Sequence, residues 1–435
     1  MITVDSRTGA IVLLVFALVL LGTWGPLLNL AERRGRHTVH TYMDFSIGFV
    51  LVPIVCGLTL GQIGGEEHGE NFFYQLQHSY EKGSSIGFAM FSGFCIFFGN
   101  LAEQYALALA GVTIAVPMFS SCIVVLGTVL NYFLDQGLNK ATILFPGVAC
   151  FALAVIAGAL THIFNEQYLG RRQRMLDASH HGHAVGNAVV GFEHGSADQA
   201  LEEGQAKSLN DSAHGSPPAL KEKDSEQKTA NGLSEEEARE RKLEMANPDS
   251  AMRSVRTSSR TRVLYGIGIA IVGGFIGALF SPGFNVTTND SFHKLPPGVK
   301  PLTVYTGYFW FCVMYFFLAL IVTQVMFRYP PLGQARSNWA AWAKDRTWLS
   351  LIGFTSGVLV SIANVLQFLG GQAAGYAASD MVQANPIVST FWGILFFREY
   401  RRTSPQAYTT LVSMYCFFIA AVALLASSAQ VRPGQ

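Results

Sequence analysis

The chain has 435 residues, of which 50% are hydrophobic and only 14% are charged, and its formal net charge is +1. A mean hydropathy of +0.31 exceeds what a soluble domain easily hides in its core. The near-neutral charge gives no sign of a nucleic-acid partner, and none is expected. The composition favours an integral membrane protein with the lipid bilayer around it.

Ten apolar runs recur along the chain, each close to the roughly 20 residues with which a helix crosses a bilayer. Helix is the expected form, because lipid offers no hydrogen-bond partner to free backbone groups. The predicted spans are residues 9–30, 42–62, 85–109, 112–134, 141–164, 263–281, 303–327, 348–369, 372–397 and 407–429. We interpret the first as a retained helix, because it lacks the basic leader and cleavage site of a signal peptide.

A polar segment, residues 165–262, separates the first five spans from the last five. It has few large apolar residues and is expected to be largely disordered, with one surface helix over LSEEEARERKLEMA (233–246). His180, His181 and His183 in this segment are more typical of a solvated stretch than of a metal site, so no metal is predicted. The predicted organisation is a first transmembrane half (1–164), this segment, and a second transmembrane half (263–435).

Basic residues gather at alternate ends of the predicted spans. The clusters lie at 33–36, 171–174, 253–262, 328–346 and 398–402. The positive-inside rule makes their side cytoplasmic, together with the central segment. Both termini and the 282–302 loop are then expected outside the cell, where Asn285 and Asn289 begin glycosylation sequons.

The two halves show a weak internal repeat. A shift of 264 residues aligns 99–135 with 363–399 without a gap and pairs Asn100 with Asn364. Because each half has five spans, the second half is inverted, an arrangement that in transporters places the binding site near the midplane. The sequence therefore predicts an all-α fold of ten helices in a 5+5 inverted repeat.

Polar side chains inside the spans are the candidate site residues, because such groups face a bundle interior or a water-filled cavity rather than lipid. The candidates for substrate binding are Trp24, Asn100, Gln104, Ser121, Asn364, Gln367, Gln372, Tyr376, Gln383 and Asn385. On the helix that starts at Gln372, residues 372, 376, 379, 380 and 383 share one stripe by helical spacing. Simple helix packing or helix-to-helix hydrogen bonding is the alternative role for Trp24, Asn100, Asn364 and Ser121.

Two carboxyl groups inside the spans, Glu103 and Asp380, are the candidates for carrying a coupling ion, since burying them without a function is costly. Asp44 and Asp135 lie near span ends and are interpreted as structural and interfacial, respectively.

No G-x-x-x-x-G-K-[ST] motif, catalytic triad or paired-carboxylate hydrolase pattern occurs. The sequence therefore indicates neither an ATP-driven pump nor an enzyme, and no cofactor is expected beyond an ion gradient.

Four long blocks carry a family resemblance. They are LGTWGPLLNLAERRGRHTVHTYMDFSIG (21–48), NYFLDQGLNKATILFPGVACFALAV (131–155), SPGFNVTTNDSFHKLPPGVKPLTVYTGYFWF (281–311) and QFLGGQAAGYAASDMVQANPIVSTFWGILFFREYRR (367–402). They resemble the plant-type ureide permeases of the drug/metabolite transporter superfamily. The resemblance implies proton-coupled secondary transport of allantoin and related oxo-nitrogen heterocycles, such as uracil and xanthine, at the plasma membrane. The Walker-like motif described for the central segment of some members is missing here.

Two other hypotheses remain open at this point. One is a carrier of a neutral sugar or another small metabolite within the same superfamily. The other is a membrane receptor or scaffold that acts through residues 165–262. The residues alone also leave the coupling ion open between a proton and a sodium ion.

Overall fold

The computed structural model describes Val4, residues 6–63, 71–202, 248–330, 334–396, Tyr400 and 403–430. These residues form helices and short connections without any β-strand, so the all-α prediction is confirmed for them. Within the same residues, nine helical stretches are long and apolar enough to cross a membrane. The prediction of a multi-pass membrane protein is therefore confirmed, and the count of ten spans stays a prediction.

The first half contains five long helices and two short ones. They are α1 (Arg7–Arg33), α2 (Thr38–Leu58), α3 (Phe72–Gln77), η2 (Ser79–Lys82), α4 (Gly83–Ala110), α5 (Val112–Leu134) and α6 (Ala141–Glu202). Polar caps fix where several begin, because a side-chain oxygen can satisfy a free N–H of the first turn. Ser6 Oγ accepts from Gly9 N at 3.1 Å, and Asn71 Oδ1 accepts from Tyr74 N at 2.7 Å.

The second half is more interrupted. Its elements are α8 (Pro248–Gly277), α9 (Phe280–Asn289), α10 (Val304–Arg328), α11 (Trp339–Lys344), α12 (Trp348–Ala374), α13 (Tyr376–Ser379), η4 (Asp380–Ala384), α14 (Pro386–Phe396) and α15 (Pro405–Ser428). The predicted outer loop over 282–302 is wrong in its first part, because residues 282–289 belong to α9 and are mostly buried.

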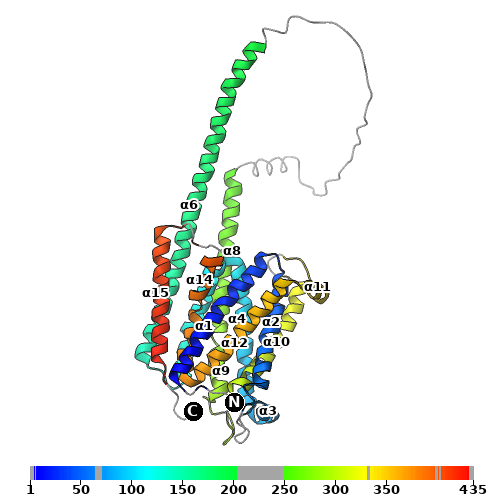
Figure 1. Ribbon diagram of the computed structural model, residues 1–435, viewed down its shortest axis with the longest axis vertical. Helices are drawn as coiled ribbons and strands as arrows, with labels where there is room; N and C mark the ends of the chain where they lie inside the picture. Colours follow the sequence, from blue (N-terminus) through cyan, green and yellow to red (C-terminus); the bar gives the residue numbers. More distant parts are fainter. Residues whose placement is uncertain are drawn as a thin grey trace, which may run out of the picture. The chain divides into compact units, whose positions relative to one another are not determined.

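Close helix pairs organise the bundle in Figure 1: α1 packs along α12, α12 along α2, and α10 along both α2 and α4. Glycines permit the closest approach. A Cβ atom added at Gly357 of α12 would lie 1.9 Å from Phe45 O of α2. Aromatic rings fill the interior between these helices, and Phe284 of α9 stacks on Phe368 of α12 with ring centroids 3.7 Å apart.

The predicted ninth span, 372–397, is not one continuous helix. Helix α12 ends at Ala374, and Gly375 adopts φ 90° and ψ 135°, a conformation that side-chain-bearing residues rarely take. A turn of helix (α13), a 3-10 stretch (η4) and a short helix that begins at Pro386 (α14) follow. The predicted single stripe from Gln372 to Gln383 is therefore wrong, because Gln372 lies before this break, at the end of α12.

Gly111 ends α4 in the same way that Gly375 ends α12. Its φ is 81° and its ψ is 166°, and a shift of 264 residues pairs the two glycines. Both positions lie in the positive-φ region that is nearly reserved for glycine. One helix of each half thus ends at an equivalent point for the same backbone reason.

The chain divides into two units, Met1–Asn165 together with Arg260–Gln435, and Glu166–Ser259. Helices α6 and α8 extend into the central segment from both sides. Residues 203–247, which include the expected surface helix over 233–246, lie outside the described residues. The disorder expected for the segment as a whole stays a prediction.

Candidate functional site

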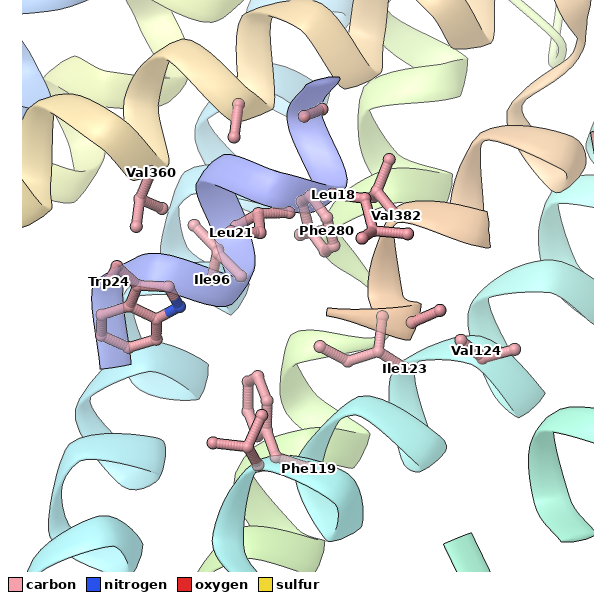
Figure 2. Close-up of a cluster of buried hydrophobic side chains, with 14 of the residues drawn as sticks. Leu18, Leu21, Trp24, Ile96, Phe119, Ile123, Val124, Phe280, Val360 and Val382 are labelled. Atoms are coloured by element: carbon pink, nitrogen blue, oxygen red, sulfur yellow. The ribbon is translucent and has the colours of Figure 1, made fainter. Parts of the chain in front are cut away.

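Apolar side chains from α1, α4, α5, α9, α12 and η4 gather at the centre of the bundle (Figure 2). We call this group the central cluster; its labelled members are Leu18, Leu21, Trp24, Ile96, Phe119, Ile123, Val124, Phe280, Val360 and Val382. Trp24 is 4% exposed, and its ring lies 5.5 Å from that of Phe45 between centroids. The predicted aromatic candidate Trp24 is thus an interior side chain.

Three predicted amide side chains continue the helix faces of the central cluster. Asn100 lies one turn beyond Ile96 on α4, and Asn364 and Gln367 lie one and two turns beyond Val360 on α12. All three amides are buried. Buried polar groups are normally hydrogen-bonded, and leaving one unpaired costs about 1–3 kcal/mol.

These amides are not satisfied by the protein. Both amide atoms of Gln367, which is fully buried, lack a hydrogen-bond partner. Asn100 Nδ2 lies near the hydroxyl group of Tyr315, and Asn364 Nδ2 lies near that of Tyr308. Neither nitrogen makes a hydrogen bond of normal geometry. The interior thus presents amide donors and an amide acceptor that are free to bind a ligand.

Asp380 is fully buried at the start of η4, beside α5 and beside Ser281 of α9. Its Oδ2 accepts hydrogen bonds from Asn131 Nδ2 at 3.1 Å and from Thr128 Oγ1 at 3.3 Å. Asn131 Nδ2 also donates to Ser281 Oγ at 2.8 Å. Asp380 Oδ1 has no hydrogen-bond partner. The carboxyl group therefore has one satisfied oxygen and one free oxygen in the protein interior.

Hydrogen bonds continue from Asp380 toward the end of α5. Asn285 Nδ2 donates to Asn131 Oδ1 at 3.2 Å and to Asp135 Oδ1 at 3.0 Å. Asp135 Oδ2 in turn accepts from the backbone N–H of Tyr376 at 2.8 Å, directly after the break at Gly375. We call these linked groups the Asp380 network; its members are Thr128, Asn131, Asp135, Ser281, Asn285 and Asp380.

Most of the Asp380 network was missed by the sequence reasoning. Asp135 lies at the end of α5 as expected, and its interfacial position stays a prediction, but its side chain is buried and holds the backbone of α13. The spacing of Thr128, Asn131 and Asp135 on one face of α5 was a usable signal. Their partners on α9 were hidden by the loop prediction for that segment.

The first of the two predicted glycosylation sites is corrected by its position. Asn285 is fully buried and donates both hydrogen bonds that link Asn131 to Asp135, so it is not accessible to a glycan. Asn289, at the end of α9, is half-buried and donates to Asn285 Oδ1 at 2.7 Å. Glycosylation of Asn289 stays a prediction.

Tyr376 and Gln104 hold helices together. The hydroxyl group of Tyr376 lies 2.8 Å from Thr288 Oγ1, which connects α13 to α9. Gln104 Nε2 donates to Glu32 Oε1 at 2.7 Å and to Thr38 O at 3.2 Å, which connects α4 to α1 and α2. A role for either in substrate binding stays a prediction.

The remaining candidates are Ser121, Gln372, Gln383 and Asn385. Ser121 is half-buried and donates to Pro117 O of its own helix. Gln383 and Asn385 are buried and bonded to each other, with Asn385 Nδ2 3.5 Å from Gln383 Oε1. Gln372 is half-buried on α12. A role for any of the four in substrate binding stays a prediction.

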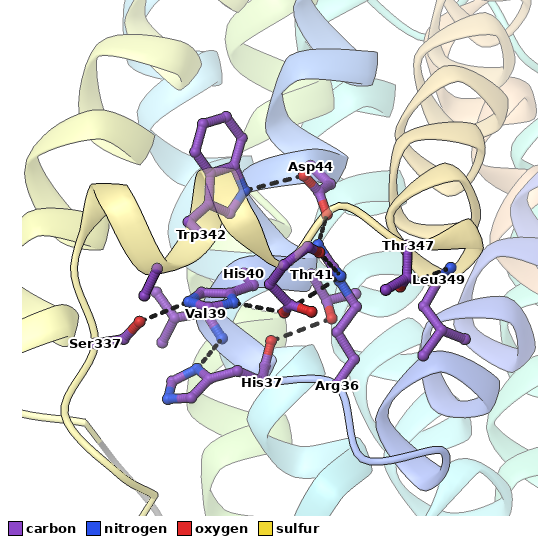
Figure 3. A network of polar contacts seen from close by, with 12 residues as sticks. Arg36, His37, Val39, His40, Thr41, Asp44, Ser337, Trp342, Thr347 and Leu349 are labelled. Atoms are coloured by element: carbon purple, nitrogen blue, oxygen red, sulfur yellow. Dashed lines mark hydrogen bonds and ion pairs between the residues drawn. The ribbon is translucent and has the colours of Figure 1, made fainter.

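A second polar network joins the ends of α1, α2, α11 and α12 (Figure 3). The buried Arg36 guanidinium pairs with Asp44, and its Nη1 lies 3.3 Å from Asp345 Oδ2. His40 Nδ1 lies 2.8 Å from the same Asp345 oxygen, and Trp342 Nε1 donates to Asp44 Oδ1 at 3.0 Å. Asp44 thus has the structural role expected from the sequence.

A groove of about 720 Å³ runs between α4 and α8 and is lined mainly by apolar side chains, such as Phe98 and Val272. It contains none of the candidate residues. Its apolar lining suits lipid rather than a polar solute.

The fold and its interior define a class of protein. Membrane-length helices enclose unpaired amides and a buried carboxyl network, and two predicted spans are interrupted, at residues 278–279 and after Gly375. Interrupted helices around polar interior groups are typical of membrane transporters. The protein is a multi-pass membrane protein of this class.

The comparison with known proteins identifies the family. The ureide permease family model matches residues 41–428. Ureide permease 1 of Arabidopsis thaliana is 39% identical over 435 residues, which cover 99% of this chain and 100% of that protein. Ureide permease 2 of the same plant is 40% identical over 436 residues, with the same coverage. Probable ureide permease A3 of Vigna unguiculata is 36% identical over 409 residues, or 93% of this chain and 99% of that protein.

The chain therefore belongs to the ureide permease family, whose name describes transporters and not enzymes. No solved structure matches the chain.

Proposed function

We propose that the protein is a secondary transporter that imports ureides such as allantoin and related oxo-nitrogen heterocycles such as uracil and xanthine, with protons as the coupling ion. The observation that carries the proposal is Gln367, whose fully buried amide has no partner on either its nitrogen or its oxygen. The relatives named ureide permeases support the same class of substrate.

The chemistry of these substrates suits the free amides. Ureides and nucleobases are neutral and carry adjacent N–H and C=O groups, to which an Asn or Gln side chain offers the complementary acceptor and donor. Asn100, Asn364 and Gln367 supply such groups beside the apolar central cluster. Trp24 supplies a flat ring on which a planar heterocycle can stack.

The packing of the helices supports an inverted repeat of ten spans. Suppose that α1 of the first half corresponds to α9 of the second half, and α4 to α12. The packing of α1 along α12 is then repeated by the packing of α9 along α4. Likewise, the pair α12 with α2 has its counterpart in α4 with α10. In this arrangement α13, η4 and α14 together form the ninth, discontinuous span. Inverted repeats of this kind let one half rock against the other around a central site.

A neutral solute is concentrated only when its movement is coupled to that of an ion. Glu103 and Asp380 are the buried carboxyl groups inside the spans that are candidates for carrying a proton. We place the end with Arg36 and Asp345 in the cytoplasm and both termini outside, because basic residues favour the cytoplasmic side. The proposed location is the plasma membrane.

The test is uptake of labelled allantoin and uracil into yeast that lacks its own carriers, in acidic and in near-neutral medium. The proposal expects uptake that rises in acid and collapses with a protonophore. Absence of uptake of both substrates, with the protein shown at the cell surface, contradicts it. Uptake of a neutral sugar by the same cells would then replace the ureide proposal by the sugar-carrier hypothesis.

A further inference from the structure

We infer that Asp380, and not Glu103, is the residue that binds the coupling proton, and that the proton is carried on Oδ1. The rest of the Asp380 network then links this event to the helix break at Gly375. The inference rests on the proposed function and deepens it, because it assigns the coupling step to one atom.

The hydrogen bonds on the carboxyl group of Asp380 are distributed unevenly between its two oxygens. Ser281 is a third hydrogen-bond partner of this carboxyl group, beside Asn131 and Thr128. Asn131 Nδ2 and Thr128 Oγ1 point at Oδ2, and Oδ1 is buried without a partner. A neutral carboxyl group has one oxygen that accepts hydrogen bonds and one that carries the proton. The surroundings of Asp380 thus fit the neutral acid, with its O–H bond formed at Oδ1.

The charged groups around Asp380 also favour its neutral form. The acidic group that faces Asp380 is Asp135, directly after the end of α5. The titratable hydroxyl groups on neighbouring elements are Tyr376 of α13 and Tyr415 of α15, which donates to Ile387 O. Helices α9 and α15 contain no acidic or basic residue, and α1 has them only near its ends. Ionisation of Asp380 therefore places a second carboxylate in the network that already contains Asp135.

The Asp380 network is connected to the helix break at Gly375. Asp135 accepts the N–H of Tyr376, and Asn139 donates to Ala374 O at 3.0 Å, so side chains from the connection that follows α5 hold both sides of the break. Loss of the proton makes Oδ2 of Asp380 a stronger hydrogen-bond acceptor for Asn131. Asn131 and Asp135 both accept hydrogen bonds from Asn285, so a change at Asn131 reaches Asp135. The charge of Asp380 thus acts on the group that holds the break.

Glu103 lacks such a connection. It is buried on α4, but no hydrogen bond or ion pair joins it to another residue in the described part of the chain. Its neighbour Gln104 is bonded toward Glu32 and Thr38, away from the network of α5, α9 and η4. A proton on Glu103 therefore has no defined structural consequence.

The transport test compares Asp380→Asn with Glu103→Gln. An asparagine places its nitrogen where the O–H of the neutral acid would lie and keeps an oxygen for Asn131 and Thr128, so Asp380→Asn imitates the protonated state. We expect Asp380→Asn to exchange labelled for unlabelled substrate but to lose accumulation and acid stimulation. Glu103→Gln is expected to keep both. Full accumulation by Asp380→Asn, or accumulation by the wild type that follows sodium instead of pH, overturns the inference.

A second measurement does not depend on substrate or on the folding of Asp380→Asn. Infrared spectra of the purified wild type and of Glu103→Gln are recorded as the pH is raised, and the carbonyl band of a buried protonated carboxyl group is followed. We expect this band in Glu103→Gln as in the wild type, and its loss from Asp380→Asn where that variant folds. A band that disappears in Glu103→Gln overturns the inference. If the wild type transports no ureide but keeps the band in Glu103→Gln, only the proposed function fails.

Discussion

Replacing Gly375 with alanine is expected to destabilise the protein more than the equivalent change at Gly111. Both glycines have positive φ, 90° and 81°, so alanine at either costs about 1–3 kcal/mol of backbone strain. A Cβ at Gly375 would also lie 2.5 Å from Asn139 Oδ1, whereas nothing lies within 4 Å of one at Gly111.

The difference follows from what Asn139 must give up. Its Nδ2 donates to Ala374 O at 3.0 Å and to Ser428 O at 3.4 Å, and each hydrogen bond contributes about 0.5–1.5 kcal/mol. Moving Asn139 therefore brings the cost of Gly375→Ala to about 2–6 kcal/mol in total.

Thermal unfolding of the purified variants in detergent measures the order of their stabilities. Gly87→Ala is the control, because a Cβ there meets open space on an exposed face of α4. We expect Gly375→Ala to melt lowest, Gly111→Ala to lie between, and Gly87→Ala to match the wild type or exceed it slightly. If Gly375→Ala is as stable as Gly111→Ala, the contact with Asn139 does not hold the break.

Two further changes test the packing and the second polar network, again by thermal unfolding. In Gly357→Ala the new Cβ would lie 1.9 Å from Phe45 O, so α2 and α12 must separate at a cost of about 1–3 kcal/mol; unchanged stability would show that they do not pack this closely. Arg36→Ala leaves the buried Asp44 without its cation and is expected to cost about 3–5 kcal/mol, whereas a loss below about 1 kcal/mol, as for a surface pair, would contradict the buried geometry.

The long helices could be predicted because their apolar runs have the length of a bilayer crossing and begin at polar caps such as Ser6 and Ser404. The break at Gly375 could not. Alanines lie on both sides of it, and the backbone conformation of the glycine, which the sequence pattern does not show, ends the helix. A similar limit applies to α9, whose polar residues suggested a loop until their partners on α5 were known.

The candidate site was predicted in part. Asn100, Asn364 and Gln367 stood out as amides inside apolar helices, and the structure leaves them buried and incompletely paired. Asp380 also stood out, but its partners did not, since Asn131 and Ser281 come from two other helices far away in sequence. Which polar residues meet depends on helix packing, which the pattern of one helix does not contain.

The central claim is that the free amide of Gln367 binds substrate, and Gln367→Leu tests it most directly. Leucine keeps most of the volume and removes two unpaired buried polar atoms, so the variant is expected to be as stable as the wild type or more stable. Without these hydrogen bonds, the half-saturating concentration for labelled allantoin uptake should rise by at least roughly fivefold.

Gln372→Leu is the matched control, because Gln372 lies on the same helix but is only half-buried, and its uptake should change little. A stable Gln367→Leu protein with impaired uptake, beside a normal Gln372→Leu, is the result that the account predicts. Normal allantoin uptake by Gln367→Leu would contradict it.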